Sequence, residues 1–202
     1  PVIDFNVTSS SNPESISSAD LTVDLSGPSS EAVTVDYTVT GTAESGTDYT
    51  LVDDTLTINA GEITGTITIA SIIDDLIDES DETVIVTLSN PSNATLGGND
   101  VHTYTITDND DAPTIEFNSV SSSGDESVSS ADLTVDLSGP SSEAVTVDYT
   151  VTGTAESGTD YTLVDGTLTI NASETSGTIN ISNIIDDLID ESDETVIVTL
   201  SN

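Results

Sequence analysis

An internal repeat dominates this sequence and limits what the chain can fold into. A long stretch that begins at Leu21 recurs unchanged from Leu133, and a second stretch that begins at Ile72 recurs from Ile184. Both copies follow at the same offset of 112 residues, so the register between them is kept throughout. The chain must therefore build one module twice, and each module has the size of a small domain.

The repeat sets the domain boundaries that we expect. The first module covers residues 1–112, and the second covers residues 113–202 and opens with PTIEF where the first opens with PVIDF. The second copy stops at the counterpart of Asn90, so nothing in this sequence corresponds to residues 101–110. We expect the second module to be truncated at its C-terminal end and to lack its last strand.

Apolar side chains alternate with polar ones through both modules. They form 34% of the chain and are mostly Val, Ile and Leu, which argues against the disorder that so charged a chain would otherwise suggest. An alternation with a period of two residues is typical of half-buried strands. The pattern predicts seven strands in the first module, at residues 2–7, 20–26, 32–40, 55–59, 64–72, 82–89 and 101–108. Seven strands in about a hundred residues are typical of a β-sandwich, so we predict an all-β protein of two tandem sandwiches.

The charge of the chain limits its partners. The sequence has 38 Asp and Glu residues, one His and no Lys or Arg, and its formal net charge is −38. Such a chain repels polyanions, so we expect neither nucleic acid nor an anionic membrane surface as a partner. No apolar run approaches the roughly 18 residues of a spanning helix, so we expect no direct membrane insertion. Cations are the partners that this composition favours.

The acidic residues concentrate at one end of the predicted first sandwich. If consecutive strands are antiparallel, the first, third and fifth connections and the exit from the last strand share one end. Fourteen acidic residues fall there: Glu14, Glu44, Asp48, Asp53, Asp54, Asp74, Asp75, Asp78, Glu79, Asp81, Glu82, Asp108, Asp110 and Asp111. The opposite end holds three: Glu31, Glu62 and Asp100. Such an imbalance is unfavourable unless a cation neutralises it.

The type of ligand favours calcium as that cation. Carboxylate oxygens without Cys or a clustered His favour hard ions over zinc or copper. Magnesium is the second candidate, but it requires near-octahedral order and retains its waters, whereas flexible acidic loops suit the six to eight oxygens of calcium. The loops lack the glycine, the distant glutamate and the flanking helices of an EF-hand.

Several motifs in a fixed order resemble a known family. GTAESGTDY begins at Gly41, IIDDLIDESDE begins at Ile72, and TYTITDND begins at Thr103. In this order the motifs are similar to the Calx-β domain, and the match covers essentially the whole chain twice. The resemblance implies a seven-stranded immunoglobulin-like sandwich that binds calcium through the acidic loops at one end.

The resemblance also implies which residues would be ligands. In the first module they are Glu14, Asp48, Asp74, Asp75, Glu79, Glu82, Asp108 and Asp110, together with the backbone carbonyl of Ile77. In the second module they are Glu126, Asp160, Asp186, Asp187, Ile189, Glu191 and Glu194. Two positions depart from members of the family with more acidic loops, because Leu76 follows the aspartate pair and Asn109 interrupts the last motif. The second module has nothing to match Asp108 and Asp110, so we expect it to bind calcium less well.

The sequence favours a structural role over catalysis. We expect His102 to be a surface histidine on an edge strand, with no Ser or Cys spaced as in a catalytic triad, so we predict that the chain is not an enzyme. Near-identical tandem modules suggest a calcium-binding repeat of an extracellular, cell-surface adhesin, in which calcium rigidifies the junction between modules. Its partners would then be calcium ions, neighbouring repeats and a cell-surface or matrix ligand. The alternative is a calcium-sensing regulatory pair of a membrane transporter, as the family resemblance implies for sodium/calcium exchangers.

Overall fold

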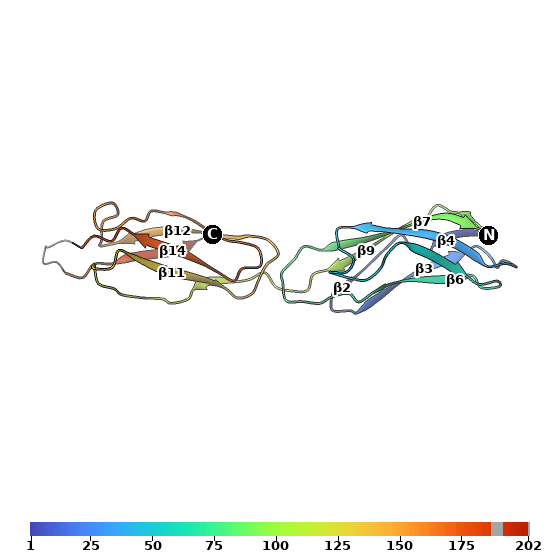
Figure 1. Cartoon of the computed structure of the whole chain (residues 1–202), viewed down its shortest axis with the longest axis horizontal. Helices are drawn as coiled ribbons and strands as arrows, with labels where there is room; N and C mark the ends of the chain where they lie inside the picture. The colour runs from blue at the N-terminus through green and yellow to red at the C-terminus, as the bar shows by residue number, and fades with distance from the viewer. Residues whose placement is uncertain (187–191, 202) are drawn as a thin grey trace. The chain divides into compact units, whose positions relative to one another are not determined.

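The computed structural model describes residues 1–186 and 192–201, and its regular elements are all β-strands (Figure 1). The chain folds into two compact units, one of Pro1–Asp75 with Ser80–Asn109 and the other of Leu76–Glu79 with Asp110–Asn202. Among the described residues, no helix is long and apolar enough to cross a membrane. The predicted all-β class is confirmed.

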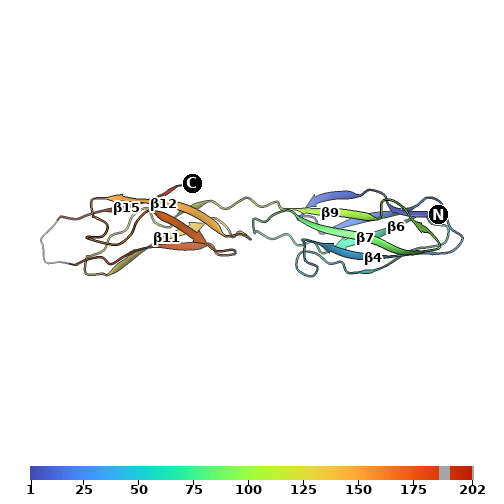
Figure 2. The same cartoon turned by 90° about the horizontal axis from the view of Figure 1, so that it is seen from above.

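The first unit is a sandwich of two sheets. Its strands are β1 (Val2–Phe5), β2 (Ser9–Pro13), β3 (Ser18–Leu25), β4 (Val33–Gly41), β5 (Asp54–Ile58), β6 (Thr64–Ala70), β7 (Glu82–Ser92), β8 (Thr95–Leu96) and β9 (Val101–Thr107). One sheet has the order β6-β3-β1-β8 and the other β2-β9-β7-β4-β5. Figure 2 shows β7 between β9 and β4, as this order requires. The acidic connections predicted for one end of the sandwich follow β2, β4, β6 and β9.

The core of the first unit lies between these two sheets. Leu21, Val23 and Leu25 of β3 are buried, and the residues between them are half-exposed. Val84 and Val86 of β7 face the same core from the other sheet and are fully buried. The period-two alternation in the sequence therefore corresponds to one buried and one solvent-facing side of each strand.

The chain changes sheets soon after the first predicted strand, residues 2–7, which the structure has as Val2–Phe5. β1 pairs with β3, whereas β2 pairs in parallel with β9, in register from Ser9 opposite Thr103 to Pro13 opposite Thr107. The sequence of β2 is SSSNP and has no apolar alternation, so the pattern that revealed the other strands is missing. Main-chain pairing with β9 holds this strand in place.

The prediction for His102 is wrong. β9 lies between β2 and β7 and is not an edge strand, and the His102 side chain is only 2% exposed. Its Nε2 lies 2.8 Å from Ser10 Oγ and its Nδ1 2.6 Å from the carbonyl oxygen of Val7. The ring also lies 5.4 Å from that of Phe5. His102 thus ties β9 to the segment that joins β1 to β2, and its burial leaves no room for a substrate at this Ser–His pair.

The second unit repeats most of this arrangement. Its strands are β10 (Ile115–Phe117), β11 (Ser130–Leu137), β12 (Val145–Gly153), β13 (Gly166–Ile170), β14 (Ser176–Ser182) and β15 (Val196–Ser201). They form two sheets, with orders β10-β11-β14 and β13-β12-β15. Residues 121–125, which correspond to β2, are not in a strand. Within the described part of this unit nothing corresponds to β9.

Steric crowding requires glycine at the first position of the GTAESGTDY motif. Gly41 ends β4 with φ of +134°, and a Cβ built there would lie 2.0 Å from the carbonyl oxygen of Thr83. Gly153 has the same surroundings in the second unit, with φ of +140° and Thr195 as the neighbour. Only glycine allows the ends of β4 and β12 to approach the start of the neighbouring strand in the sheet, β7 or β15, this closely. The chain then enters the acidic loop.

Candidate metal centre

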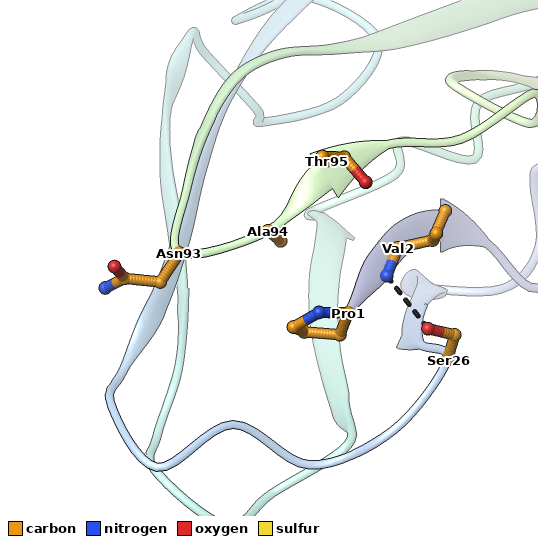
Figure 3. Close-up of a pocket in the computed structure, with 6 residues that line it drawn as sticks. All are labelled: Pro1, Val2, Ser26, Asn93, Ala94 and Thr95. Atoms are coloured by element: carbon orange, nitrogen blue, oxygen red, sulfur yellow. Dashed lines mark hydrogen bonds between the residues drawn. The ribbon is translucent and has the colours of Figure 1, made fainter.

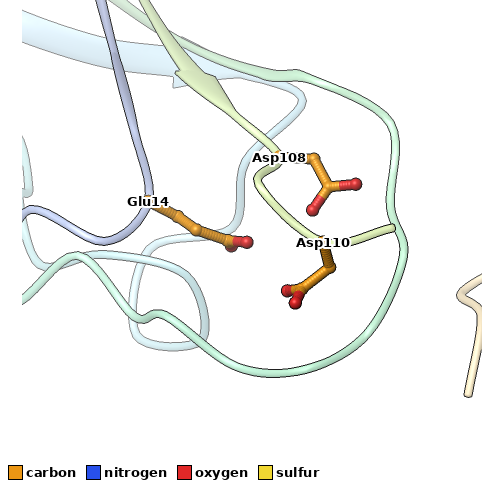
Figure 4. Close-up of side chains that lie close together, drawn as sticks. All are labelled: Glu14, Asp108 and Asp110. Carbon is orange, nitrogen blue, oxygen red and sulfur yellow. The ribbon is translucent and has the colours of Figure 1, made fainter. Parts of the chain in front are cut away.

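Three carboxylate side chains converge where the chain leaves β9. Glu14, Asp108 and Asp110 each offer an oxygen, and these oxygens all lie within 4.8 Å of one another. Figure 4 shows the side chains gathering from two segments that are far apart in the sequence. Glu14 is buried and the two aspartates are half-buried, so this negative charge is partly removed from water.

The parallel pairing of β2 with β9 builds this cluster. The backbone N–H of Glu14 donates to the carbonyl oxygen of Thr107 at 3.0 Å, which extends the ladder one residue beyond β2. Glu14 therefore lies beside the end of β9, where the chain continues into Asp108. The strand that lacked a sequence signal is thus the element that positions the buried carboxylate.

Asn109 and Asp81 connect the neighbouring loops to this cluster. Asn109 donates through Nδ2 to Asp74 Oδ1 at 3.3 Å, and its own Oδ1 accepts from the N–H of Ser15 at 3.3 Å. The N–H of Asp108 donates to Asp81 Oδ1 at 3.2 Å. Neither Asn109 nor Asp81 is among the ligands implied by the resemblance. In the sequence, their positions inside the acidic motifs are the only feature that could have pointed to these linking roles.

The GTAESGTDY loop closes the same end of the sandwich. The N–H of Glu44 donates to Asp48 Oδ2 at 2.6 Å, and the N–H of Ile73 donates to the backbone oxygen of Asp48 at 2.9 Å. Burial raises the pKa of the Tyr49 phenol, and the nearby carboxylates of Asp48 and Glu82 raise it further. Four acidic segments, which are separate in the sequence, therefore meet at one end of the unit.

The donor set fits a hard divalent cation. All three groups are carboxylates, which calcium and magnesium prefer, and no thiol or imidazole lies among them. Calcium binds oxygens at about 2.3–2.6 Å, so two ligands of one ion lie at most roughly 5 Å apart. The 4.8 Å limit within this cluster satisfies that condition. Since the sequence contains no Lys or Arg, a bound cation is the natural means of neutralising the buried charge.

Comparison with protein families identifies the module. The model of the Calx-beta domain matches residues 1–110 and again residues 108–202. The chain belongs to the Calx-beta domain family. Calx-beta domains are binding and regulatory domains, not catalytic ones. The resemblance that we drew from the motifs is confirmed.

Solved structures agree with a tandem of Calx-beta domains. The chain is similar to the crystal structure of CBD12 from CALX1.2, with 26% identity, a TM-score of 0.51 and coverage of 100% of this chain and 80% of that one. It is also similar to the calcium binding domain CBD12 of CALX1.1, with 26% identity, a TM-score of 0.50 and coverage of 98% and 78%. No curated protein matches the chain.

The remaining predicted ligands of the first Calx-beta domain do not join this group of three. Asp48 and Asp74 take part in the hydrogen bonds described above. Asp75 is exposed, whereas Ile77, Glu79 and Glu82 are half-buried. The first three precede β7, and Glu82 is the first residue of that strand. Among the described residues, Glu14, Asp108 and Asp110 form the only group of three or more acidic, His or Cys side chains whose ligand atoms lie within 4.8 Å of one another.

The second Calx-beta domain shows the same local turn but a different environment for its glutamate. The N–H of Glu156 donates to Asp160 Oδ2 at 2.6 Å, as in the first domain. Glu126, Asp186 and Glu194 are exposed. The exposure of Glu126 contrasts with the burial of its counterpart Glu14. The other predicted ligands of this domain, Asp187, Ile189 and Glu191, lie outside the described residues.

A shallow pocket in the first domain, unlike the acidic cluster, is lined by uncharged side chains. It is lined by Pro1, Val2, Ser26, Asn93, Ala94 and Thr95 (Figure 3). The hydrogen bond drawn across it joins the N–H of Val2 to Ser26 Oγ at 2.8 Å. None of these lining residues has a carboxylate or an imidazole, so they offer no charged group for binding a metal ion or for acid–base catalysis.

Proposed function

We propose that this chain is a calcium-binding structural repeat of an extracellular, cell-surface protein of the adhesin type. The observation that carries the proposal is the buried carboxylate of Glu14 beside Asp108 and Asp110, in a chain with no basic side chain other than one histidine. The similarity to CBD12 of CALX1.1, which is described as a calcium binding domain, supports the choice of ion.

Each residue of the cluster has a definite part in this proposal. Glu14 would hold calcium from the end of β2, and Asp108 and Asp110 from the chain that leaves β9. Asn109, between the two aspartates, holds the loop of Asp74 and the backbone of Ser15 against the same segment. When bound, the ion supplies the positive charge that offsets the repulsion between these carboxylates. The segments that they belong to would then be held together.

The mechanical part of the proposal concerns the junction between the domains. Asp108 and Asp110 stand just before Pro113, with which we expect the second domain to begin. Only a few residues therefore separate these two proposed ligands from the second domain. We propose that calcium fixes the direction in which the chain leaves β9 and that its removal loosens the junction. A long surface protein made of such repeats would need this stiffness to present a distant tip.

The sensor role remains the alternative because of the similarity to the CALX domains. Near-identical copies favour an array that arose by duplication, whereas a sensor pair usually diverges into unequal parts. A parent gene with many further copies would favour the structural role. A flanking membrane transporter domain would favour the sensor role.

Titration calorimetry with calcium tests the binding itself. We expect saturable binding in the range of roughly 10⁻⁴ to 10⁻³ M that is typical of extracellular modules. Asp108→Asn and Asp75→Asn should each weaken it, while Glu31→Gln, which removes the same charge at the opposite end, should leave it unchanged. Unchanged affinity and stoichiometry in Asp75→Asn would remove that residue from the ligand set. No binding by the unaltered chain would refute the proposal.

Small-angle X-ray scattering with calcium and with chelator tests the mechanical role. The proposal predicts a longer and narrower distance distribution in calcium, because the junction stiffens. If the distribution is the same in both conditions while both domains remain folded, calcium is only a local stabiliser.

A further inference from the structure

The side chain of Asn109 links two segments of the first Calx-beta domain that are far apart in the sequence. Its Nδ2 donates to Asp74 Oδ1 at 3.3 Å, and its Oδ1 accepts from the backbone N–H of Ser15 at 3.3 Å. Ser15 directly follows Glu14, and Asp74 lies in the connection between β6 and β7. Asn109 itself belongs to the chain that leaves β9. One amide therefore ties together three segments that each carry a predicted calcium ligand.

Only an amide side chain suits both of these partners. The N–H of Ser15 is a donor and requires an acceptor, whereas the carboxylate of Asp74 is an acceptor and requires a donor. An ionised aspartate at position 109 could accept from Ser15, but it has no proton to donate and would repel Asp74. The reverse orientation of the amide would place donor against donor and oxygen against oxygen, so the two partners also determine which way the amide points. Asparagine is thus the residue that this position requires for both bonds.

The bond from Asn109 restrains a carboxylate that burial does not fix. At the start of the connection between β6 and β7, the N–H of Ile72 donates to the carbonyl oxygen of Ser17 at 3.1 Å, and the N–H of Ile73 donates to that of Asp48 at 2.9 Å. Both backbone bonds precede Asp74, whose side chain is exposed. Exposed loop segments with few restraints open locally at little cost in free energy. Loss of the Asn109 bond should therefore loosen the chain around Asp74.

We propose that Asn109 is a positioning residue that holds the segments of Glu14 and Asp74 in place before calcium binds, an inference that rests on the proposed calcium function. Its amide links these acidic segments without adding to their negative charge. A site whose segments are already ordered loses less affinity than one that the ion must assemble. Aspartate at this position would offer another carboxylate to the ion but would lose the bond to Asp74. The residue at position 109 therefore sets the balance between order without calcium and charge for calcium.

Asn109→Ala tests the positioning role, because it removes both hydrogen bonds and leaves the net charge unchanged. In chelator, amide hydrogen exchange of residues 73–75 should become at least about threefold faster, as expected from the loss of a hydrogen bond of ordinary strength. Calcium affinity, measured by titration calorimetry, should fall by about threefold or more, because only the ordered fraction of the chain binds. In saturating calcium, exchange of residues 73–75 should return to the rate of the parent chain, because the ion then holds this segment.

Two further variants separate the bond from the charge and from the site. Asn109→Asp has a side chain of the same size, and in chelator it should speed exchange of residues 73–75 more than Asn109→Ala does, since a repelling carboxylate replaces the donor. Asn59→Ala is the matched control. It removes a bond of 3.1 Å from an amide to the carboxylate of Glu62, in the connection between β5 and β6. It should change neither calcium affinity nor exchange of residues 73–75.

The outcomes distinguish this inference from the proposed function. If the parent chain binds calcium and Asn109→Ala binds it equally well, Asn109 has no positioning role and the calcium proposal stands. If exchange in Asn109→Ala stays fast in saturating calcium, the residue only supports the fold, and the inference is again overturned. If the parent chain itself binds no calcium, the proposed function fails and this inference fails with it.

Discussion

The same side chains have different surroundings in the two domains. Val84, Val86 and Leu88 of β7 are almost completely buried, whereas the identical residues of β15 are half-buried. The sequence around them is repeated exactly, so the difference comes from β9, which covers β7 and has no counterpart among the described residues of the second domain. Closing the core of this fold therefore depends on its last strand.

The acidic end shows the same dependence. Glu14 is buried beside Asp108 and Asp110, whereas Glu126 is exposed. Glu14 reaches its place because β2 pairs with β9, whereas residues 121–125, in which Gly124 and Asp125 replace Asn12 and Pro13, form no strand. The turn of Glu44 with Asp48 recurs unchanged in Glu156 with Asp160, because it needs only neighbouring residues. Local turns thus form in both domains, while the buried carboxylate cluster requires the long-range pairing.

A matched pair of core truncations should show the largest effect. Leu88→Ala should destabilise the first domain by about 3 kcal/mol, because truncating a buried leucine side chain leaves a cavity in the core. Leu200→Ala should cost the second domain only about 1 kcal/mol, because part of that side chain already contacts water. Hydrogen exchange resolved by segment can measure both. Equal costs in the two domains would show that β9 contributes little to the core.

His102→Ala tests what connects β9 to β2. The substitution removes two hydrogen-bonded ring nitrogens and leaves a cavity, so we expect a loss of about 2 kcal/mol in the first domain. Exchange of the amides in residues 9–13 should speed up toward that of residues 121–125, and the second domain should be unaffected. If residues 9–13 stay protected while the domain loses stability, the backbone ladder alone holds β2.

Charge removal at the paired glutamates should have the smallest effect and the opposite sign. Without calcium, Glu14→Gln should stabilise the first domain by roughly 1 kcal/mol, because it relieves repulsion at a buried site. In calcium the same change should reduce the stabilisation that the ion provides. Glu126→Gln, at an exposed site, should change neither by more than about 0.5 kcal/mol. Chemical denaturation in chelator and in calcium measures all four values.

Most of the fold could be predicted from the sequence because most strands alternate in hydrophobicity. β6 lies within its predicted range, and β3 and β4 match theirs to within two residues at each end. β2 and the two-residue strand β8 could not be predicted from the sequence. Main-chain pairing with distant strands holds them, and their side chains show no hydrophobic alternation. The burial of His102 was missed for the same reason, since without β2 its strand would be an edge.

The candidate site divides in a similar way. The gathering of acidic loops at one end follows from the order of the strands, and the motifs carry the family resemblance. The closeness of Glu14 to Asp108 and Asp110 depends on the pairing of β2 with β9, and the linking roles of Asn109 and Asp81 depend on side-chain positions. None of these contacts leaves a periodic pattern in the sequence.

Thermal unfolding in calcium and in chelator tests the central claim most directly. A ligand that binds only the folded domain at one hundred times its Kd adds about 2.7 kcal/mol, so 10 mM calcium at a Kd of about 10⁻⁴ M should raise the Tm of the first domain by roughly 10 °C or more. The second domain should respond less, and magnesium at the same concentration should have a smaller effect on both. Identical melting of the first domain in chelator and in 10 mM calcium would contradict the account.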